Sequence, residues 1–337
     1  MSTSRLRNLG VLGTGQIALE HVRAAQAAGA RIVAGSATSQ DSPRWHAFAA
    51  AAPGARFVAD GAALLADPQV DAVIACLPWS VTEAWLPRLL SAPKPVLIEK
   101  PLALSAHCVA EALATPGARL ADKQVGYNRR FYAPVQALKA RVARGGLKTV
   151  EVTVAESVGR LAERYGPAIV PHILAQSSSH VLDAALHLFG ALRPVRVYAH
   201  DEPGYGAAHQ SLTGLLETAD GVPVWLAAHA DDPATTGIRC RFEDRTAWVL
   251  SPMEQLIVYQ GLDVTEPTID VRVRRYAPRP IAEHRAEGPG KPGFFGQMQA
   301  FVTGQGRGIA ATPAESLQVL ELIESLQRDA MTTEHAS

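Results

Sequence analysis

The residues from Leu9 to Glu20 constrain the fold of this chain more than any other stretch. They form an apolar run, a glycine-rich turn and the start of an alanine-rich segment that ends near Gly29. This order predicts a strand, a tight turn and a helix, as found at dinucleotide-binding sites. Gly13 permits the turn, Gly15 lets the backbone approach a pyrophosphate, and Ala18 lets the helix lie close to its strand.

The first turn of the predicted helix presents free N–H groups and a partial positive charge to phosphates. A GxGxxA pattern alone is weak, because small residues also occur in ordinary structural turns. Here it follows a strand pattern and opens a helix pattern, which favours the dinucleotide interpretation. The residues expected to contact the cofactor in this turn are Gly13, Thr14, Gly15, Gln16 and Ile17.

Length and charge limit the remaining possibilities. A chain of 337 residues exceeds one ordinary domain, so we expect a dinucleotide-binding domain over residues 1–127 and a substrate-binding and oligomerisation domain over residues 128–337. The 32 basic and 32 acidic residues cancel, and no overall field would attract nucleic acid or an anionic membrane. We therefore expect a small-molecule partner and neither nucleic acid nor membrane.

The cysteines and the N-terminal segment indicate a cytoplasmic protein. Cys76, Cys108 and Cys240 lie far apart without CxxC spacing, so neither a disulfide framework nor a zinc knuckle is expected. The short polar segment from Met1 to Asn8 runs into the first strand and leaves no room for a signal peptide. No apolar stretch reaches the length of a membrane span.

The end of the second predicted strand, Ala30 to Ser36, bears on the choice between NAD and NADP. Dinucleotide folds usually carry an acidic residue there for the ribose 2′-hydroxyl, and this chain has none. Ser36, Thr38 and Ser39 can instead hydrogen-bond a 2′-phosphate, and Arg44 is a further candidate. This favours NADP, although a polar loop with loose selectivity explains the same residues equally well.

Strand and helix patterns then alternate through the first domain, which predicts a doubly wound parallel sheet. Two apolar strands end in residues expected at the ligand edge of that sheet. Leu77 and Pro78 follow one strand and are expected to lie along the cofactor; the alternative is a turn with a buried tryptophan. Glu99 and Lys100 follow the next strand, where the lysine is placed to exchange a proton with a hydroxyl or carbonyl.

The second half of the chain shows strand patterns with hairpin turns, followed by a C-terminal helix pattern. Alternating segments predict strands at 149–155, 195–199, 212–218 and 222–228, and shorter ones near 238–242, 247–250, 256–259 and 271–274. A turn at 219–221 joins two of them. Thr312 and Glu315 have the spacing of a capping box that opens a helix over residues 313–328. Because an antiparallel sheet leaves one face to be covered, we expect a homodimer or homotetramer packed through it.

One helix carries an unusual polar face. Ser177 to Phe189 predicts a helix with serines as N-cap, and its polar side chains, His180, Asp183 and His187, fall within a sector roughly 60° wide. A solvent-facing helix would usually carry Lys, Glu or Gln there, so we expect this face to line a pocket. Acid–base catalysis, a structural network and a zinc site using the three residues all remain open, though no cysteine supports zinc.

These motifs together resemble the Gfo/Idh/MocA family of oxidoreductases, which includes inositol and nucleotide-sugar dehydrogenases. The resemblance rests on Gly13 to Ala18, Glu99-Lys100-Pro101, Gly126 to Phe131 and the spacing from Asp183 to His187. It implies an N-terminal Rossmann domain that binds NAD or NADP, and a C-terminal α+β domain with a large, mostly antiparallel open sheet. It also implies that Lys100 is catalytic beside the nicotinamide.

The resemblance further implies roles in the substrate pocket. It places Asn128 near the substrate, and an aspartate with a histidine four residues later, here Asp183 and His187, against the reacting carbon. His180 has a counterpart in some relatives and would hold the substrate or orient the pair. One departure is plain, since many relatives carry three glycines where this chain has residues 176–179, Gln-Ser-Ser-Ser.

We therefore expect an oxidoreductase that transfers hydride between a nicotinamide and a secondary alcohol of a sugar, cyclitol or sugar derivative. His187 would act as general base, Lys100 would stabilise the developing alkoxide, and Asp183 would orient both. Two other functions are consistent with the same residues. One is a non-catalytic regulator on the same fold, and the other is a zinc-dependent enzyme that uses the His-Asp-His face.

Overall fold

The computed structural model describes residues 8–202 and 204–332, so the expectation for the segment before the first strand lies outside it. Packing divides the chain into two compact units. One contains the residues through Tyr132, together with Leu174–Asp183 and Glu287–Glu324. The other contains Ala133–Ile173, Ala184–Ala286 and the residues from Ser325. The packing does not test the roles predicted for residues 1–127 and 128–337.

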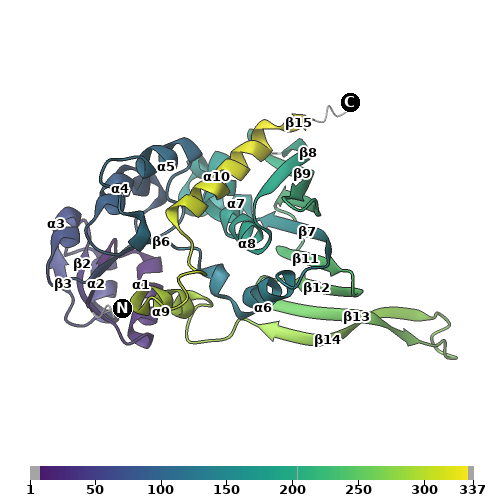
Figure 1. The fold of residues 1–337 in the computed structure, drawn as a ribbon. Helices are drawn as coiled ribbons and strands as arrows, with labels where there is room; N and C mark the ends of the chain where they lie inside the picture. The colour runs from purple at the N-terminus through teal and green to yellow at the C-terminus, as the bar shows by residue number, and fades with distance from the viewer. Residues whose placement is uncertain (1–7, 203, 333–337) are drawn as a thin grey trace. The chain divides into compact units, whose positions relative to one another are not determined.

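The first unit is built on a parallel sheet with helices around it (Figure 1). Its six described strands lie in the order β3-β2-β1-β4-β5-β6. The strands are β1 (Asn8–Leu12), β2 (Arg31–Ser36), β3 (Arg56–Val58), β4 (Ala72–Ala75), β5 (Val96–Ile98) and β6 (Lys123–Val125). The helices between them are α1 (Gln16–Ala27), α2 (Pro43–Ala51), α3 (Gly61–Ala66), α4 (Trp79–Ser91) and α5 (Ala106–Leu113). The predicted doubly wound sheet is confirmed.

A segment from the far end of the chain completes the core of this unit. Helix α9 (Phe294–Thr303) packs against α1, and its Phe294, Met298 and Phe301 join the buried cluster around β1. Helix α10 (Pro313–Arg328) follows. Its predicted capping box is confirmed, since the main-chain N of Glu315 donates to the Thr312 hydroxyl and the main-chain N of Thr312 donates to the Glu315 carboxylate.

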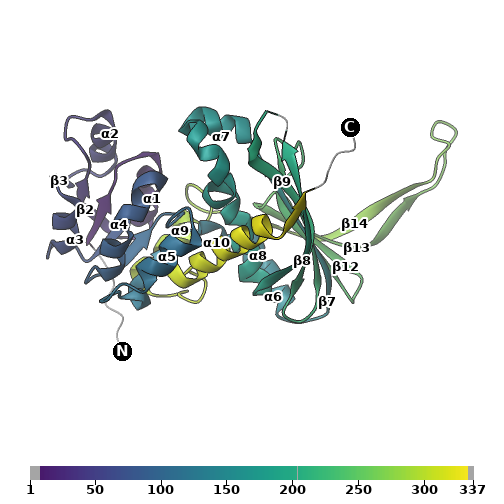
Figure 2. The same cartoon turned by 90° about the horizontal axis from the view of Figure 1, so that it is seen from above.

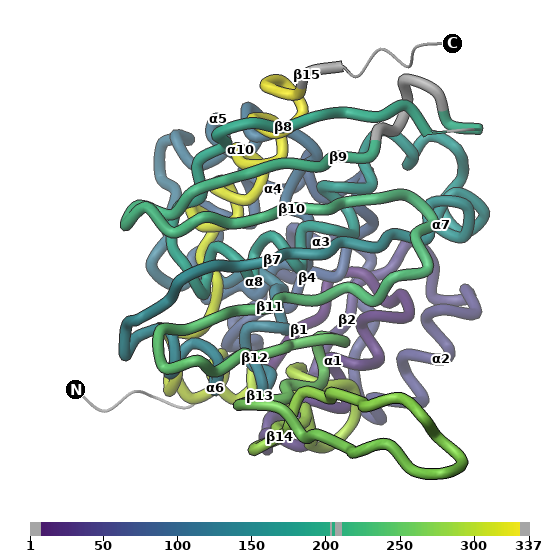
Figure 3. Tube along the Cα trace, turned by 90° about the vertical axis from the view of Figure 1, so that its right-hand side faces the viewer, coloured from purple at the N-terminus to yellow at the C-terminus, as the bar shows by residue number. Residues whose placement is uncertain are grey.

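The second unit holds a sheet of nine described strands, in the order β14-β13-β12-β11-β7-β10-β9-β8-β15 (Figure 3). All neighbours are antiparallel except the pairs β7 with β10 and β8 with β15. The strands are β7 (Leu147–Glu156), β8 (Leu192–Glu202), β9 (Gly206–Thr218), β10 (Pro223–Ala230), β11 (Gly237–Phe242), β12 (Thr246–Leu250), β13 (Gln255–Thr265), β14 (Arg275–Arg285) and β15 (Ala330–Thr332). The predicted open, mostly antiparallel sheet is confirmed.

Side chains alternate across this sheet. In β10, Val224, Leu226 and Ala228 are buried, whereas Trp225 between them is 54% exposed. Helix α6 (Ala133–Val142) packs on β12, β13 and β14 and covers the buried face at that end (Figure 2). Helix α7 (Val158–Tyr165) also belongs to this unit. The sheet therefore has one covered face and one face that is open within the unit.

Two local predictions were wrong. The last strand was expected at residues 271–274, but β14 begins at Arg275 and continues through Pro278 and Pro280. An edge strand tolerates prolines because an outward N–H has no ladder partner, so these residues do not end it. The polar helix α8 (Ser179–Phe189) has no serine N-cap, because the π-helical turn η4 (Leu174–Ser178) leads directly into it.

Candidate active site

The glycine turn after β1 has the shape that a dinucleotide requires. Gly13 has φ of +87°, and a Cβ there would lie 2.5 Å from the carbonyl oxygen of Cys76. Only glycine fits such a position. Its N–H donates to the carbonyl oxygen of Ser36 over 2.9 Å, so the turn lies between the ends of β2 and β4. This is the switch point of the sheet, where doubly wound folds bind their ligand.

The N-terminus of α1 is open to an anion. Gly15 is the N-cap, without a side-chain hydrogen bond to the helix, and the first turn carries no acidic residue. A Cβ on Gly15 would meet nothing within 4 Å. Thr14 is buried, Ile17 is half-buried and Gln16 is exposed. Free N–H groups with open space before them fit the pyrophosphate of a dinucleotide.

The loop after β2 leaves polar groups on the surface. Ser36 is buried, whereas Thr38, Ser39 and Arg44 are exposed. The hydroxyl of Ser39 accepts a hydrogen bond from the N–H of Asp41 over 3.1 Å, which orders the loop before α2. The side chain of Arg44 therefore lies on the surface in the first turn of the helix that follows this loop.

The ends of β4 and β5 lie at the same edge. Leu77 is half-buried and Pro78 is exposed at the start of α4. Glu99 is buried, with one carboxylate oxygen 2.7 Å from Nε2 of His21 and the other accepting from the main-chain N of Lys100. A Cβ at Gly126 would lie 2.8 Å from that carboxylate. Glu99 thus fixes the backbone that carries Lys100.

Lys100 is joined to the start of the polar helix. Its Nζ donates to the carbonyl oxygen of Gln176 over 2.5 Å, in the π-helical turn η4. Short π-helical segments are frequent at functional sites. Half-buried His180 follows Gln176 by four residues, about one helical turn. Burial first, and then the charge of Lys100, lower the pKa of this histidine well below its usual value. Lys100, Gln176 and His180 therefore form one group within the first unit.

Two buried polar atoms of this group have no hydrogen-bond partner in the described part of the chain. They are Nδ1 of His180 and Oε1 of Gln176. The ring of Tyr127 packs edge-on against the imidazole, with centroids 5.8 Å apart. Buried polar atoms usually have a partner, which can be protein or an ordered small molecule. The group thus offers polar atoms to a hydroxyl-bearing ligand.

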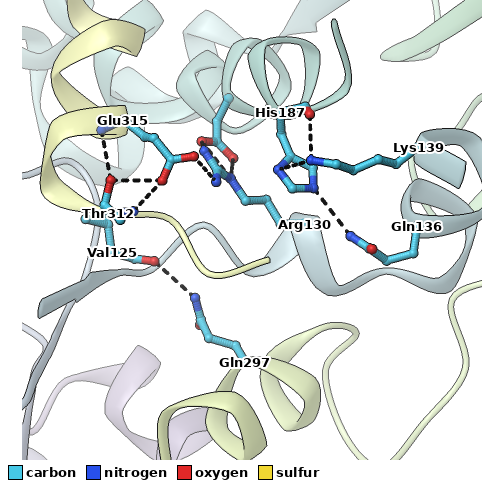
Figure 4. A network of polar contacts seen from close by, with 9 residues as sticks. Val125, Arg130, Gln136, Lys139, His187, Gln297, Thr312 and Glu315 are labelled. Carbon is cyan, nitrogen blue, oxygen red and sulfur yellow. Dashed lines mark hydrogen bonds and ion pairs between the residues drawn. The ribbon is translucent and has the colours of Figure 1, made fainter. Parts of the chain in front are cut away.

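Asp183 is held by an arginine. Its carboxylate is fully buried and accepts hydrogen bonds of 2.7 to 3.1 Å from Nε and Nη2 of Arg130, which also donates to Glu315 over 2.7 Å (Figure 4). Burial alone would lower the pKa of Arg130, but the two carboxylates raise it, so the guanidinium stays charged. This pair joins the short helix η2 (Asn128–Phe131) to α8.

His187 contacts two side chains of helix α6 in the second unit. Nζ of Lys139 lies 3.1 Å from its Nδ1 and donates to its carbonyl oxygen over 2.9 Å. Nε2 of Gln136 lies 3.4 Å from its Nε2 (Figure 4). Both ring nitrogens therefore face side chains of α6. A lysine on the last carbonyls of a helix is also a common stabilising contact.

Asn128, expected near the substrate, is buried. Its Nδ2 donates to the carbonyl oxygen of Pro292 over 2.9 Å. A Cβ on the next residue, Gly293, would lie 2.2 Å from the carbonyl oxygen of Asn128, so the two chain segments touch. The amide nitrogen therefore holds the loop before α9.

Comparison with known proteins relates this chain to a family of oxidoreductases. Residues 7–125 match the model of the oxidoreductase family with an NAD-binding Rossmann fold, Gfo/Idh/MocA. The chain is 32% identical to inositol 2-dehydrogenase from Paracoccus denitrificans, over 73% of this chain and 74% of that protein. It is 30% identical to inositol 2-dehydrogenase 1 from Saccharopolyspora erythraea, over 91% of this chain and 88% of that protein.

The chain belongs to the Gfo/Idh/MocA family. It is therefore an enzyme, an oxidoreductase with a Rossmann domain for a nicotinamide dinucleotide. Among solved structures, UDP-N-acetylglucosamine 3-dehydrogenase from Acidithiobacillus ferrooxidans shares the fold, with a TM-score of 0.71 and 19% identity over 96% of this chain and 97% of that one.

In this Gfo/Idh/MocA oxidoreductase, the described residues contain no cluster of three His, Cys, Asp or Glu side chains that could hold a metal ion. The zinc interpretation of the polar face therefore lacks a ligand set there, and Asp183 is already bound by Arg130. Over the same residues, no helix combines the length and hydrophobicity of a membrane span. The cytoplasmic location stays a prediction.

Sequence reasoning missed the importance of Arg130 and Gln176. The sequence indicates no more than an anchor between domains for Arg130, because a buried arginine and a surface arginine look alike in a sequence. Gln176 contributes its main-chain carbonyl, which any residue type has. The only available signal was that Arg130 stands next to the aromatic residue Phe131.

Proposed function

We propose that this enzyme oxidises a secondary alcohol of a sugar, cyclitol or sugar derivative, with NAD or NADP as hydride acceptor. The observation that carries the proposal is the group of Lys100, Gln176 and His180 at the carboxyl edge of the parallel sheet. The two inositol 2-dehydrogenase relatives support a polyhydroxylated substrate. When bound, the nicotinamide supplies the hydride chemistry.

His180 is the group that we assign to take the hydroxyl proton. Its Nδ1 has no hydrogen-bond partner in the described part of the chain, and burial and the charge of Lys100 lower its pKa, so the neutral imidazole has a lone pair for the hydroxyl proton. It is only half-buried, unlike Asp183, so part of its surface is open to a ligand. A positioned general base of this kind typically accelerates a reaction by about 10²- to 10⁴-fold.

Lys100 stabilises the oxygen from which the proton leaves. An ammonium group beside a developing alkoxide lowers the energy of the transition state, and it acts strongly where water is excluded. The buried carboxylate of Glu99 fixes the backbone of Lys100, and the carbonyl of Gln176 fixes its ammonium. The lysine is thus held in place before substrate binds.

Asp183 and His187 receive other roles than the sequence suggested. The buried pair with Arg130 supports a positioning role for Asp183, which holds the first turn of α8 where His180 lies. The contacts of His187 with Lys139 and Gln136 support a stabilising role. His187 as general base is the competing assignment, and the two histidines can be separated experimentally.

The test compares Lys100→Met, His180→Ala and His187→Ala. We expect the first two to lower kcat by roughly 10²-fold or more. We expect His187→Ala to lower the melting temperature while turnover per folded molecule stays near wild type. Single-turnover hydride transfer with a panel of inositols, sugars and nucleotide sugars measures the chemistry, and cofactor binding by fluorescence shows that each variant retains its Rossmann site. A loss confined to His187→Ala would return the base role to that residue.

For the cofactor we propose a preference for NADP. No carboxylate stands at residues 36–39, and the exposed Thr38, Ser39 and Arg44 are donors available to a 2′-phosphate.

For assembly we propose a homodimer or homotetramer that packs through the open face of the nine-stranded sheet. The exposed Trp225 on that face supports it.

A further inference from the structure

The strands β13 and β14 extend past their neighbours as a two-stranded arm, residues 261–279 (Figures 1 and 2). Strand β12 pairs with β13 only as far as Gln260. Beyond it, Leu262 to Thr265 pair with Arg275 to Pro278, and no third strand joins them among the described residues. A two-stranded hairpin alone is marginally stable in water.

One face of the arm is apolar. The cross-strand pairs Leu262 with Pro278 and Val264 with Tyr276 lie on the same side, because side chains two residues apart share a face. Leu262, Val264 and Tyr276 are 55%, 49% and 60% exposed. The alternating positions, including Asp263 and Thr265, place polar side chains on the opposite face.

The β14 edge of the arm is unfavourable for strand addition. β14 is the last strand of the sheet, and Pro278 and Pro280 lie within it. Prolines at an edge remove the N–H groups that another strand would need. A partner on the β14 side therefore meets the apolar face of the arm rather than that edge.

The charges of the arm point to a protein surface. Arg274 donates from Nε and Nη2 to the carboxylate of Glu266 over 2.9 and 2.7 Å, and Nε of Arg279 donates to the carbonyl oxygen of Gln260. Both arginines already have partners, one in the arm and one at its base. Since the whole chain also has a formal net charge of zero, a polyanion is not attracted and a second copy is not repelled.

The exposed apolar area is close to what an interface needs. Six large apolar side chains of the arm are exposed, namely Leu262, Val264, Ile269, Val271, Val273 and Tyr276. At roughly 100 Å² each they present on the order of 600 Å², at the top of the range for the largest patch of a typical monomer and about three quarters of the ~800 Å² per partner of a standard interface.

We propose that the arm docks on a second copy of this chain, with its apolar face against the same face of the partner's arm. Such a contact is self-complementary about a two-fold axis, so one contact covers both arms. It is separate from the contact proposed for the open face of the sheet, and it does not depend on the proposed substrate.

The test compares two variants, each of which places one negative charge on a different face of β13. Val264→Asp should lower the mass of the assembly in sedimentation equilibrium, with at least a tenfold rise in the dissociation constant. Thr265→Asp adds the same charge one residue further on, on the polar face, and should leave the mass unchanged. Thermal melting shows that both variants fold, and hydride-transfer activity is measured separately.

Chemical cross-linking gives an independent measurement. Val264→Cys should give a dimer with a short bis-maleimide, in a yield well above that of Thr265→Cys, since only the first lies on the docking face. Equal masses for the two aspartate variants, or equal cross-linking of the two cysteine variants, would overturn the proposal. If only a change at Trp225 dissociates the protein, the sheet alone carries the assembly and the arm does not.

Discussion

His180 and His187 lie on one helix, yet their surroundings give them different properties. Burial and the positive charge of Lys100 lower the pKa of His180, and its Nδ1 has no partner in the described chain. His187 faces Lys139 and Gln136 with both ring nitrogens. The residue type is the same in both cases, so the neighbours decide which imidazole is available to a substrate.

We also expect single residues to decide the choice of cofactor. Ala37→Asp introduces a carboxylate at the end of β2. This carboxylate should accept hydrogen bonds from the ribose hydroxyls of NAD and repel the 2′-phosphate of NADP. We expect the ratio of kcat/KM for NADP to that for NAD to fall by at least tenfold. Steady-state kinetics with both cofactors measure it, and Gln40→Asp, further along the exposed loop, is a matched control. Tighter binding of NAD by the wild-type enzyme would contradict the proposed preference.

At the scale of elements, Arg130 links three helices of the first unit through two carboxylates. One of them, Glu315, also completes the capping box at the start of α10. Asp183 contributes from α8, and Arg130 itself lies in η2. A change at the start of α10 therefore reaches the segment that carries His180, although α10 contributes no group to the proposed chemistry.

This link makes a prediction about pH. Burial alone would raise the pKa of Glu315, but Arg130 lowers it below its usual range. Its contribution to the free energy of unfolding is therefore complete above the unfolded-state pKa of about 4.3 and fades as pH falls through the lower folded-state pKa. We expect Glu315→Gln to be less stable than wild type at pH 7, with a gap that closes below about pH 4.

Urea unfolding at a series of pH values measures that gap. Glu321→Gln makes the same chemical change at an exposed position of α10 and should differ little from wild type at any pH. A Glu315→Gln gap that stays constant from pH 7 to pH 3 would show that the carboxylate is not stabilised by Arg130.

At the scale of the whole molecule, the open face of the nine-stranded sheet predicts self-association. Trp225 is 54% exposed there, and Trp225→Glu should convert the assembly to a smaller species in analytical ultracentrifugation. Tyr165→Glu changes an exposed aromatic residue on α7 and serves as the matched control. A wild-type protein that stays monomeric at every concentration would refute the predicted assembly.

The sequence by itself determined the elements whose signals are local. The glycine turn, four of the six strands described in the parallel sheet and the capping box of α10 follow from the order of apolar, small and polar residues over a few positions, whereas the short strands β3 and β6 were not predicted. The family resemblance carried the prediction further, to an oxidoreductase with an open antiparallel sheet, and the comparisons confirm it. Local patterns do not report where a helix turns π-helical or where an edge strand passes through proline, so η4 and β14 were predicted wrongly.

Only the tertiary structure decided which side chains meet. Arg130 and Asp183 are 53 residues apart in sequence, and Lys100 and Gln176 are 76 apart. Periodicity shows which face of an element a residue occupies, but not which distant element packs on that face. The same reason explains why α9, near the end of the chain, joins the core of the first unit. The polar helix was predicted from its sequence, whereas the partner of each charge on it depended on how the chain folds back.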